Sequence, residues 1–249
     1  MKTFLLVALF VGIASCFRLQ KSDNPDLIEG DMMLTPMQKE KLYSKDVTRN
    51  GMISEWYRWP NGIIYYQFDS AVPTSFRQLI LRSLGKIEAA TCLRFIEGAN
   101  FEGHHIRVTN IRGSGCWSYV GYNHRVQELS LGPGCEWEST VIHEFLHALG
   151  FHHQQCSSDR DDYIEVHLEN VKEDYRSNFK KYTRDEVTAY GARYDYDSIM
   201  HYSAYAFSSN GEPTMVAKIM PDGANMGEAN KMSPTDIFKI NIMYKCWRV

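Results

Sequence analysis

The sequence lacks a surplus of charge of either sign. Its 27 lysine and arginine residues and 30 aspartate and glutamate residues leave a formal net charge of −3 at pH 7. Nucleic-acid-binding proteins usually carry a concentrated basic surface, and this composition does not suggest one. Internal repeats, low-complexity tracts and Asn-x-Ser/Thr glycosylation motifs are also absent from the sequence. We therefore expect an ordinary globular protein of one or two domains without a nucleic-acid partner.

Long hydrophobic runs are absent as well. The apolar stretch from Phe4 to Ile13 follows Met1-Lys2 and precedes Ala14-Ser15-Cys16. A basic start, a short apolar core and small residues before the cut are typical of a secretory signal peptide. A membrane anchor is the alternative, but a spanning helix needs ~20 apolar residues. We predict that residues 1–16 are a signal peptide and that the mature protein is secreted, extracellular and free of the membrane.

The sequence does contain one closely spaced group of histidines, in Val141–His153 (VIHEFLHALGFHH). On a helix, His143 and His147 lie about 40° apart around the axis, so both imidazoles leave one face. Gly150 can adopt a positive φ and end the helix, which would return His153 as a third nitrogen donor. Three neutral imidazoles suit Zn²⁺ and leave its fourth position open, as catalytic zinc sites require.

Glu144 completes the chemistry that this spacing suggests. It follows His143 at about 100° around the helix axis, beside the open position. A carboxylate there can take a proton from zinc-activated water and pass it to a leaving amine. Ordinary surface or core histidines are the competing interpretation, but the full HExxHxxGxxH spacing is far more restrictive than HExxH alone. The pattern predicts a catalytic site with one Zn²⁺ per chain.

The helix pattern is typical of metzincin proteases, in which a methionine turn follows it. Ser198–Tyr202 (SIMHY) lies downstream in this sequence. Together with Gly150-Phe151, this turn resembles the astacin family, and the resemblance covers nearly all of residues 50–249. It implies an α+β fold in two lobes: a mixed twisted sheet with helices over a zinc cleft, and a less regular half below. It also implies an endopeptidase that hydrolyses internal bonds of protein or peptide substrates.

The resemblance assigns roles around the methionine turn. Met200 would form a hydrophobic floor under the histidines. The Tyr202 hydroxyl would reach the resting zinc and swing away to stabilise the tetrahedral intermediate. An ordinary core methionine and an unrelated tyrosine are the competing interpretations. In astacins a glutamate after the third histidine receives the new amino terminus through water, and Gln154 stands at that position here.

The resemblance also divides the chain into a propeptide, residues 17–49, and a catalytic domain, residues 50–249. Taken alone, residues 17–49 could be a flexible tail, because they are polar and weakly periodic. An activating protease that cuts after Arg49 would release the catalytic chain from Asn50. The precursor would then be a zymogen.

One short element of residues 17–49 resembles the Phe-x-Gly-Asp element of family propeptides. Ile28-Glu29-Gly30-Asp31 matches it except for Ile28 at the aromatic position. Gly30 lets the backbone approach a crowded site, and a carboxylate oxygen is an acceptable zinc ligand. Asp31 is therefore expected to close the open zinc position as a latch, the alternative being one more solvated acid.

Local patterns predict several elements of the catalytic domain. Ile63–Phe68 reads as a strand by its β-branched and aromatic content, and Ile106–Ile111 alternates as a half-buried strand. Residues 75–91 carry apolar side chains at helical spacing and predict an amphipathic helix. In astacins the strand that corresponds to Gln127–Leu131 forms the upper rim of the cleft and pairs with extended substrate.

Cysteine usage agrees with secretion. Of the six cysteines, Cys16 would leave with the signal peptide. The astacin pattern implies two disulfides, Cys92–Cys246 and Cys116–Cys135. Cys156 is then left over, and an odd cysteine in a secreted protein implies a free thiol or a partner chain. Apart from that possibility we expect a monomer.

Two other classes of function compete with the peptidase. The first is a catalytically silent binding module with the astacin fold, which the presence of Glu144 and all three histidines argues against. The second is a structural zinc protein, which normally fills all four zinc positions with Cys and His. Cys156 is the obvious fourth donor for that case.

Overall fold

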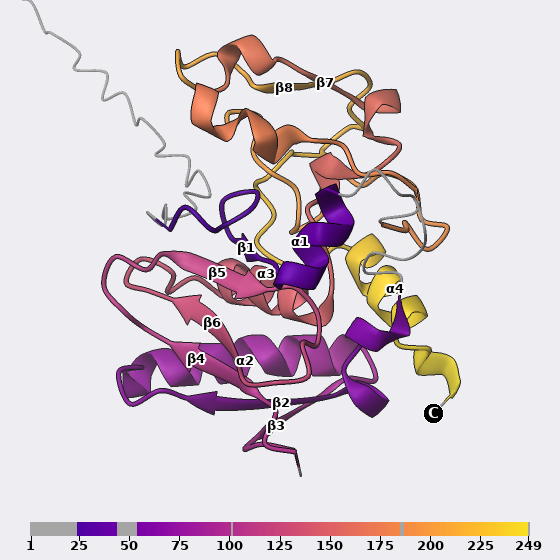
Figure 1. Cartoon of the computed structure of the whole chain (residues 1–249). Coiled ribbons are helices and arrows are strands. Elements are labelled where there is room, and N and C mark those ends of the chain that lie inside the picture. Colours follow the sequence, from indigo (N-terminus) through magenta and orange to yellow (C-terminus); the bar gives the residue numbers. More distant parts are fainter. Residues whose placement is uncertain (1–23, 44–53, 101, 185–186, 249) are drawn as a thin grey trace, which may run out of the picture.

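The structure is a computed structural model of the chain and describes residues 24–43, 54–100, 102–184 and 187–248 (Figure 1). The expected signal peptide and the expected cut after Arg49 lie outside these residues. The largest element is a six-stranded sheet with the order β1-β5-β6-β4-β2-β3. Its strands are β1 (Met32–Met33), β2 (Ile63–Phe68), β3 (Arg94–Glu97), β4 (Ile106–Thr109), β5 (Cys116–Tyr119) and β6 (Gln127–Leu131).

The sheet is mixed, as the sequence predicted. Strands β3, β2, β4 and β6 run parallel to one another. Strand β5 is antiparallel to β6, and β1 is parallel to β5, so these two strands run against the other four. Within β2, Ile64 and Tyr66 are buried while Ile63 and Tyr65 are less so. This alternation is what a strand with one face on the core requires.

Helices α2 (Thr74–Ala90) and α3 (Glu138–Leu149) lie on the same side of the sheet (Figure 1). Helix α2 buries an apolar stripe at helical spacing, made by Phe76, Ile80, Leu84 and Ile87. Such a stripe stabilises a surface helix by packing it on the core. Helix α4 (Pro234–Met243) packs on the same core through Ile240.

The second lobe is less regular and is drawn above the sheet in Figure 1. Strands β7 (Ile164–Val166) and β8 (Met215–Ala217) form an antiparallel pair in it. Short 3₁₀ helices make up much of the rest, at Gln154–Cys156, Arg160–Asp162, Leu168–Asn170 and Glu173–Phe179. The lobe has its own core, formed by Ile164, Val171, Phe179, Tyr194, Tyr196, Tyr202, Met215 and Met226. Two separate cores confirm the predicted two-lobed α+β fold.

Further short 3₁₀ helices lie at Glu55–Tyr57, Pro60–Gly62 and Cys246–Arg248.

The prediction that Gln127–Leu131 forms the rim of the cleft is wrong. Strand β6 pairs with β5 on one side and with β4 on the other, so neither of its edges is open. The strand beyond it is β5, whose outer edge is covered by β1, with Met32 opposite Ser118 and Met33 opposite Tyr119. Alternation of apolar residues reports which face of a strand is buried, but it does not report which strands lie beside it.

Residues 24–43 form two elements that periodicity did not indicate, β1 and α1 (Pro36–Tyr43). Thr35 and Gln38 start α1 with a capping box: the Thr35 amide donates to Gln38 Oε1 at 2.8 Å, and the Gln38 amide donates to Thr35 Oγ1 at 3.3 Å. Thr-x-x-Gln with proline at the first helical position is a start signal that the sequence does contain. Ile28 packs on a small cluster of Met32, Leu34, Tyr57 and Val120.

The C-terminal end of α3 is fully hydrogen-bonded although it is buried. Its last four carbonyls accept from the amides of Gly150 and Phe151, the indole of Trp59 and the hydroxyl of Tyr244, at 2.8–3.0 Å. Gly150 has φ 109° and ends the helix, as predicted. Because a buried carbonyl without a partner costs free energy, these bonds fix the point at which the chain turns toward His153.

Two glycines give a matched test of this helix end. In Gly150→Ala, the positive φ is unfavourable for alanine, and the new Cβ would lie 2.8 Å from Met243 Cε. We expect the free energy of unfolding to fall by about 1–3 kcal/mol, measured by urea denaturation.

Gly85→Ala is the control, because Gly85 lies inside α2 and an added Cβ would have no atom within 4 Å apart from the backbone of its own helix and its chain neighbours. It should stabilise the protein by about 1 kcal/mol. A Gly150→Ala protein that is as stable as the parent chain would contradict the described helix end.

Candidate metal centre

Asp31, His143, His147 and His153 each bring one ligand atom to a common point. The Nε2 atoms of His147 and His153 lie 3.1 and 3.3 Å from His143 Nε2. The Asp31 carboxylate oxygens lie 3.3–3.5 Å from the three Nε2 atoms. Ligand atoms at zinc-bonding distance around a tetrahedral ion are separated by roughly 3.3–3.5 Å. The spacing of the four atoms therefore fits one tetrahedral Zn²⁺.

Hydrogen bonds behind the rings orient two of the histidines. His143 Nδ1 donates to the Ile199 carbonyl and His147 Nδ1 to the Phe151 carbonyl, both at 2.7 Å. A carbonyl oxygen only accepts, so the proton is on Nδ1 and the Nε2 lone pairs face one another. Both Asp31 carboxylate oxygens are buried without a hydrogen-bond partner among the described residues. A cation at the common point satisfies both sets of atoms.

The charges around the centre favour a positive ion. Burial alone would lower the pKa of His153, but the carboxylates of Asp31 and Glu29 more than offset it and raise this pKa to about 9. Burial lowers the pKa of His147 to about 4, so this ring is neutral, as a metal ligand must be. Burial would raise the pKa of Asp31, yet the histidines hold it well below its usual range.

Glu144 lies on α3 next to the first histidine. It is fully buried, and neither carboxylate oxygen has a hydrogen-bond partner in the described part of the chain. Burial and the nearby Asp31 carboxylate raise its pKa well above the usual value. A strongly perturbed carboxyl group beside a candidate metal centre is a plausible proton-transfer group.

The methionine turn, Ser198–Tyr202, adjoins the segment that carries the third histidine. Met200 is 3% exposed and packs in the main core. Its carbonyl accepts from the amide of Gln154 at 2.9 Å, directly after His153. The turn thus contacts the chain next to the third histidine.

Asp236 supports this turn, and the sequence reasoning missed it. Its carboxylate accepts from Ser198 Oγ at 2.6 Å and from the amides of Ile199 and Ser233 at 3.0 Å. The carbonyl of Ile199 accepts from His143, and the amide of the same residue donates to Asp236. Asp236 therefore supports the candidate ligand His143 through the backbone of Ile199. Asp236 also forms a capping box with Ser233 at the start of α4. Ser-x-x-Asp before an apolar run is a capping signal that could have indicated it.

Tyr202 lies beside the centre but is engaged elsewhere. Its ring centroid is 4.5 Å from that of His153, and its hydroxyl donates to the backbone oxygen of Glu29. In this state the hydroxyl is held by the segment that carries Asp31.

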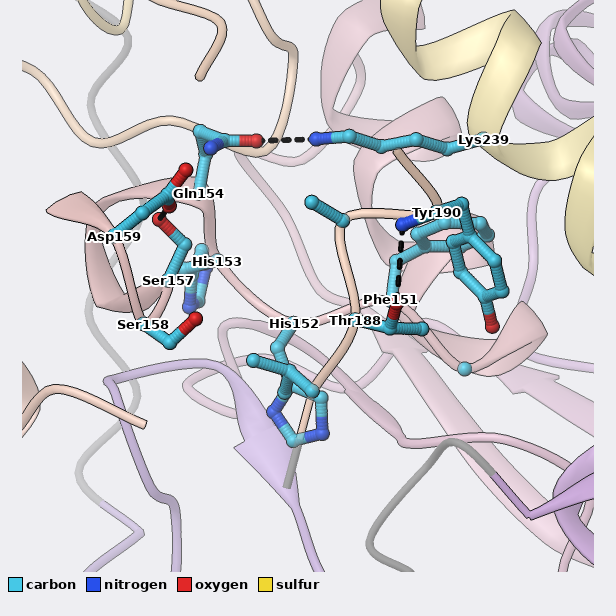
Figure 2. A pocket seen from close by; sticks show the side chains of 13 residues that line it. Phe151, His152, His153, Gln154, Ser157, Ser158, Asp159, Thr188, Tyr190 and Lys239 are labelled. Carbon is cyan, nitrogen blue, oxygen red and sulfur yellow. Dashed lines mark hydrogen bonds between the residues drawn. The ribbon is translucent and has the colours of Figure 1, made fainter. Parts of the chain in front are cut away.

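A pocket adjoins the centre on the side of His153 and Gln154 (Figure 2). Figure 2 shows Gln154 and Lys239 pointing toward each other, and Lys239 Nζ donates to Gln154 Oε1 at 2.6 Å. Lys239 is 8% exposed. Gln154 stands at the position expected to receive the new amino terminus. Its side chain therefore already accepts a hydrogen bond from the ammonium group of Lys239.

The cysteines follow the implied pairing, with disulfides Cys92–Cys246 and Cys116–Cys135. Cys156 is a buried free thiol whose Sγ donates to the Asn178 carbonyl at 3.3 Å. Burial raises the pKa of this thiol well above its usual value. Among the described residues the fourth group at the metal centre is Asp31 and not Cys156, which disfavours the structural zinc site.

A histidine helix that ends at glycine above a methionine turn defines the metzincin class of domains. The family model of astacin, which describes a family of peptidases, matches residues 51–245, and the chain belongs to this family. Blastula protease 10 of Paracentrotus lividus is 40% identical over 233 residues, which cover 88% of this chain and 38% of that protein. Meprin A subunit beta of Homo sapiens is 40% identical over 223 residues, which cover 89% of this chain and 30% of that protein.

A solved structure is also similar. High choriolytic enzyme 1, a hatching enzyme zinc-protease from Oryzias latipes (medaka fish), matches with a TM-score of 0.69 and 34% identity. The match covers 76% of this chain and 93% of that one. The chain thus spans well under half of the two longer relatives but corresponds to nearly all of the solved enzyme. Within the described residues no helix is long and apolar enough to cross a membrane.

Asp236→Ala tests the support of the methionine turn. Three donors would lose their acceptor, so we expect the free energy of unfolding of the zinc-loaded protein to fall by about 2–3 kcal/mol in urea denaturation. Zinc affinity should fall roughly tenfold in competition with a chelator, because His143 loses its indirect support.

Asp222→Ala, at an exposed position, is the control and should change neither quantity. An Asp236→Ala protein with unaltered zinc affinity would contradict the link from Asp236 to His143.

Proposed function

We propose that this chain is a secreted zinc-dependent endopeptidase, made as a zymogen, that hydrolyses internal peptide bonds of protein substrates. The convergence of the His143, His147 and His153 Nε2 atoms, 3.1 and 3.3 Å apart, carries the proposal. Membership of the astacin family and similarity to a hatching enzyme zinc-protease support it. Residues 1–16 are proposed as the signal peptide that directs secretion.

Glu144 moves the proton in the proposed reaction. Zinc held by the three histidines supplies Lewis-acid activation of water and of the substrate carbonyl. Glu144 accepts a proton on a carboxylate oxygen and delivers it to the departing nitrogen. Both of its oxygens are available, because neither has a hydrogen-bond partner among the described residues. The Tyr202 hydroxyl would donate a hydrogen bond to the developing oxyanion once Glu29 no longer holds it.

Residues 17–49 are the proposed propeptide, and Asp31 is its latch. Asp31 is fully buried within 3.3–3.5 Å of the three Nε2 atoms, so its carboxylate would occupy the fourth position of a zinc ion bound there. Its backbone oxygen also accepts from the Ser118 amide at 2.9 Å, at the outer edge of β5. A substrate strand added to this edge would need the same backbone groups. The segment would therefore block substrate in two places, at the metal position and at the edge of β5.

Gly30 permits this approach. It has φ 84°, and a Cβ at this position would lie 2.9 Å from the Phe207 ring. Release of the latch is proposed to follow a cut after Arg49, which gives a catalytic chain that begins at Asn50.

Glu144→Gln tests the general base. In the chain released after Arg49, peptide hydrolysis should fall by roughly 10²–10⁴-fold, because the proton acceptor is lost. Metal analysis should still find one zinc ion per chain, since the three histidines are intact.

Glu138→Gln, in the first turn of the same helix, is the control and should leave activity unchanged. An active Glu144→Gln protein would exclude Glu144 as the base. A wild-type chain that binds zinc but cleaves no protein would favour the silent binding module.

Asp31→Ala tests the latch in a chain that cannot be cut at Arg49. We expect this uncut chain to gain peptidase activity on short peptides and to bind a small hydroxamate inhibitor, because the fourth metal position opens. Activity and fluorescence-based hydroxamate binding measure the two effects.

Asp26→Ala is the control in the same segment, since the Asp26 side chain is 74% exposed. If uncut Asp31→Ala remains as inactive and as closed to hydroxamate as the uncut parent chain, Asp31 is not the latch.

A further inference from the structure

Glu29 is a second carboxylate in the turn that carries Asp31. Ile28 and Met32 close this turn: the Ile28 amide donates to the Met32 carbonyl at 2.8 Å, and the Met32 amide donates to the Ile28 carbonyl at 3.0 Å. Glu29 has φ 53°, a left-handed conformation that is unfavourable for a residue other than glycine. Such a conformation persists only where the surroundings hold it. The turn brings both carboxylates to the buried metal centre.

Each polar group of Glu29 has a hydrogen-bond partner, and only 3% of the residue is exposed. Its amide donates to Asn178 Oδ1 at 3.1 Å, and its backbone oxygen accepts from the Tyr202 hydroxyl. Carboxylate Oε2 accepts from His153 Nδ1 at 2.8 Å, and Oε1 accepts from the Tyr182 hydroxyl. A buried and fully satisfied polar network of this kind specifies one arrangement.

His153 differs from the other two histidines in the group that accepts the hydrogen bond from its Nδ1 atom. His143 and His147 donate from Nδ1 to backbone carbonyls of the catalytic domain. His153 donates from Nδ1 to Glu29, which belongs to the proposed propeptide. A carboxylate behind a ligating histidine makes the histidine more basic and strengthens metal binding. The third ligand therefore loses its carboxylate support when the propeptide leaves.

Charge balance points the same way. A divalent cation held by three neutral imidazoles brings two positive charges into a buried site. The carboxyl groups of Glu29 and Asp31 lie 2.8 and 3.3 Å from His153, where they can offset this charge. Buried charge is tolerated when it is compensated nearby. Removal of the propeptide takes both compensating carboxylates away.

We propose that Glu29 is a positioning residue of the propeptide that strengthens His153 as a metal ligand and holds the Tyr202 hydroxyl. The precursor then binds zinc more tightly than the released catalytic chain. The propeptide is a metal-retaining element as well as an inhibitor. This inference rests on the proposed zinc function and extends it.

The test is zinc affinity of the full, uncut chain, measured by competition with a chromogenic chelator. Glu29→Ala removes the carboxylate and should weaken zinc binding by roughly tenfold or more. Glu29→Gln keeps the volume and an acceptor for His153 but removes the charge, so its affinity should fall between those of Glu29→Ala and wild type. Asp26→Asn, an exposed acid of the same segment, should bind zinc as wild type does.

Release of the propeptide supplies an internal control. Every variant then yields the same catalytic chain, so the zinc affinities should become equal and at least tenfold weaker than that of the wild-type precursor. If Glu29→Ala does not fold, the comparison of Glu29→Gln with wild type still tests the proposal. Equal zinc affinity of the Glu29→Gln and wild-type precursors, or of the precursor and the released chain, overturns the proposal.

The same experiment separates the two levels of the account. A wild-type precursor that binds no zinc contradicts the proposed function itself. If the Glu29 variants bind zinc as wild type does while Asp31→Ala opens the uncut chain, the latch stands and the role of Glu29 is wrong.

Discussion

The Nε2 atoms of His147 and His153 lie 3.1 and 3.3 Å from Nε2 of His143, and this convergence is the constraint on which the rest of the structure depends. Bare lone pairs at this distance repel unless a cation lies between them. The nearby elements hold the rings against that repulsion. Helix α3 carries two of the rings, Gly150 turns the chain so that the third returns, and the Ile199 carbonyl fixes His143 from behind. Asp236 in turn fixes the backbone of Ile199.

The centre lies where the two lobes meet, and the turn at residues 28–32 contacts both. On one side Asp31 and β1 bond the edge of β5 in the sheet lobe. On the other side Glu29 bonds Tyr182 and Tyr202 of the less regular lobe. Because the two acids project into the same buried centre, a single cut that frees the segment would remove both carboxyl groups. That loss would change the chemistry of the centre and would also free the strand edge and the tyrosine hydroxyl.

Local sequence patterns predicted the elements whose own residues show a clear alternation or helical spacing of apolar side chains. The strand Ile63–Phe68 has the predicted bounds, and the helix predicted for residues 75–91 spans Thr74–Ala90. The spacing of the histidines around Gly150 was enough to predict that they lie close together. The partners of a strand were not predictable, because β1 pairs with β5 across more than eighty residues of sequence. The roles of Asp236 and Glu29 likewise depend on groups that only the folded chain brings near them.

The most direct test of the account is a crystal structure of the full, uncut chain grown with zinc and measured at the zinc absorption edge. The account predicts one anomalous peak bound by Nε2 of His143, His147 and His153, with an Asp31 carboxylate oxygen at about 2.0–2.2 Å as the fourth ligand. Glu29 should lie behind His153 at hydrogen-bond distance from Nδ1. A zinc ion whose fourth ligand is water, with residues 28–32 away from the centre, would contradict it.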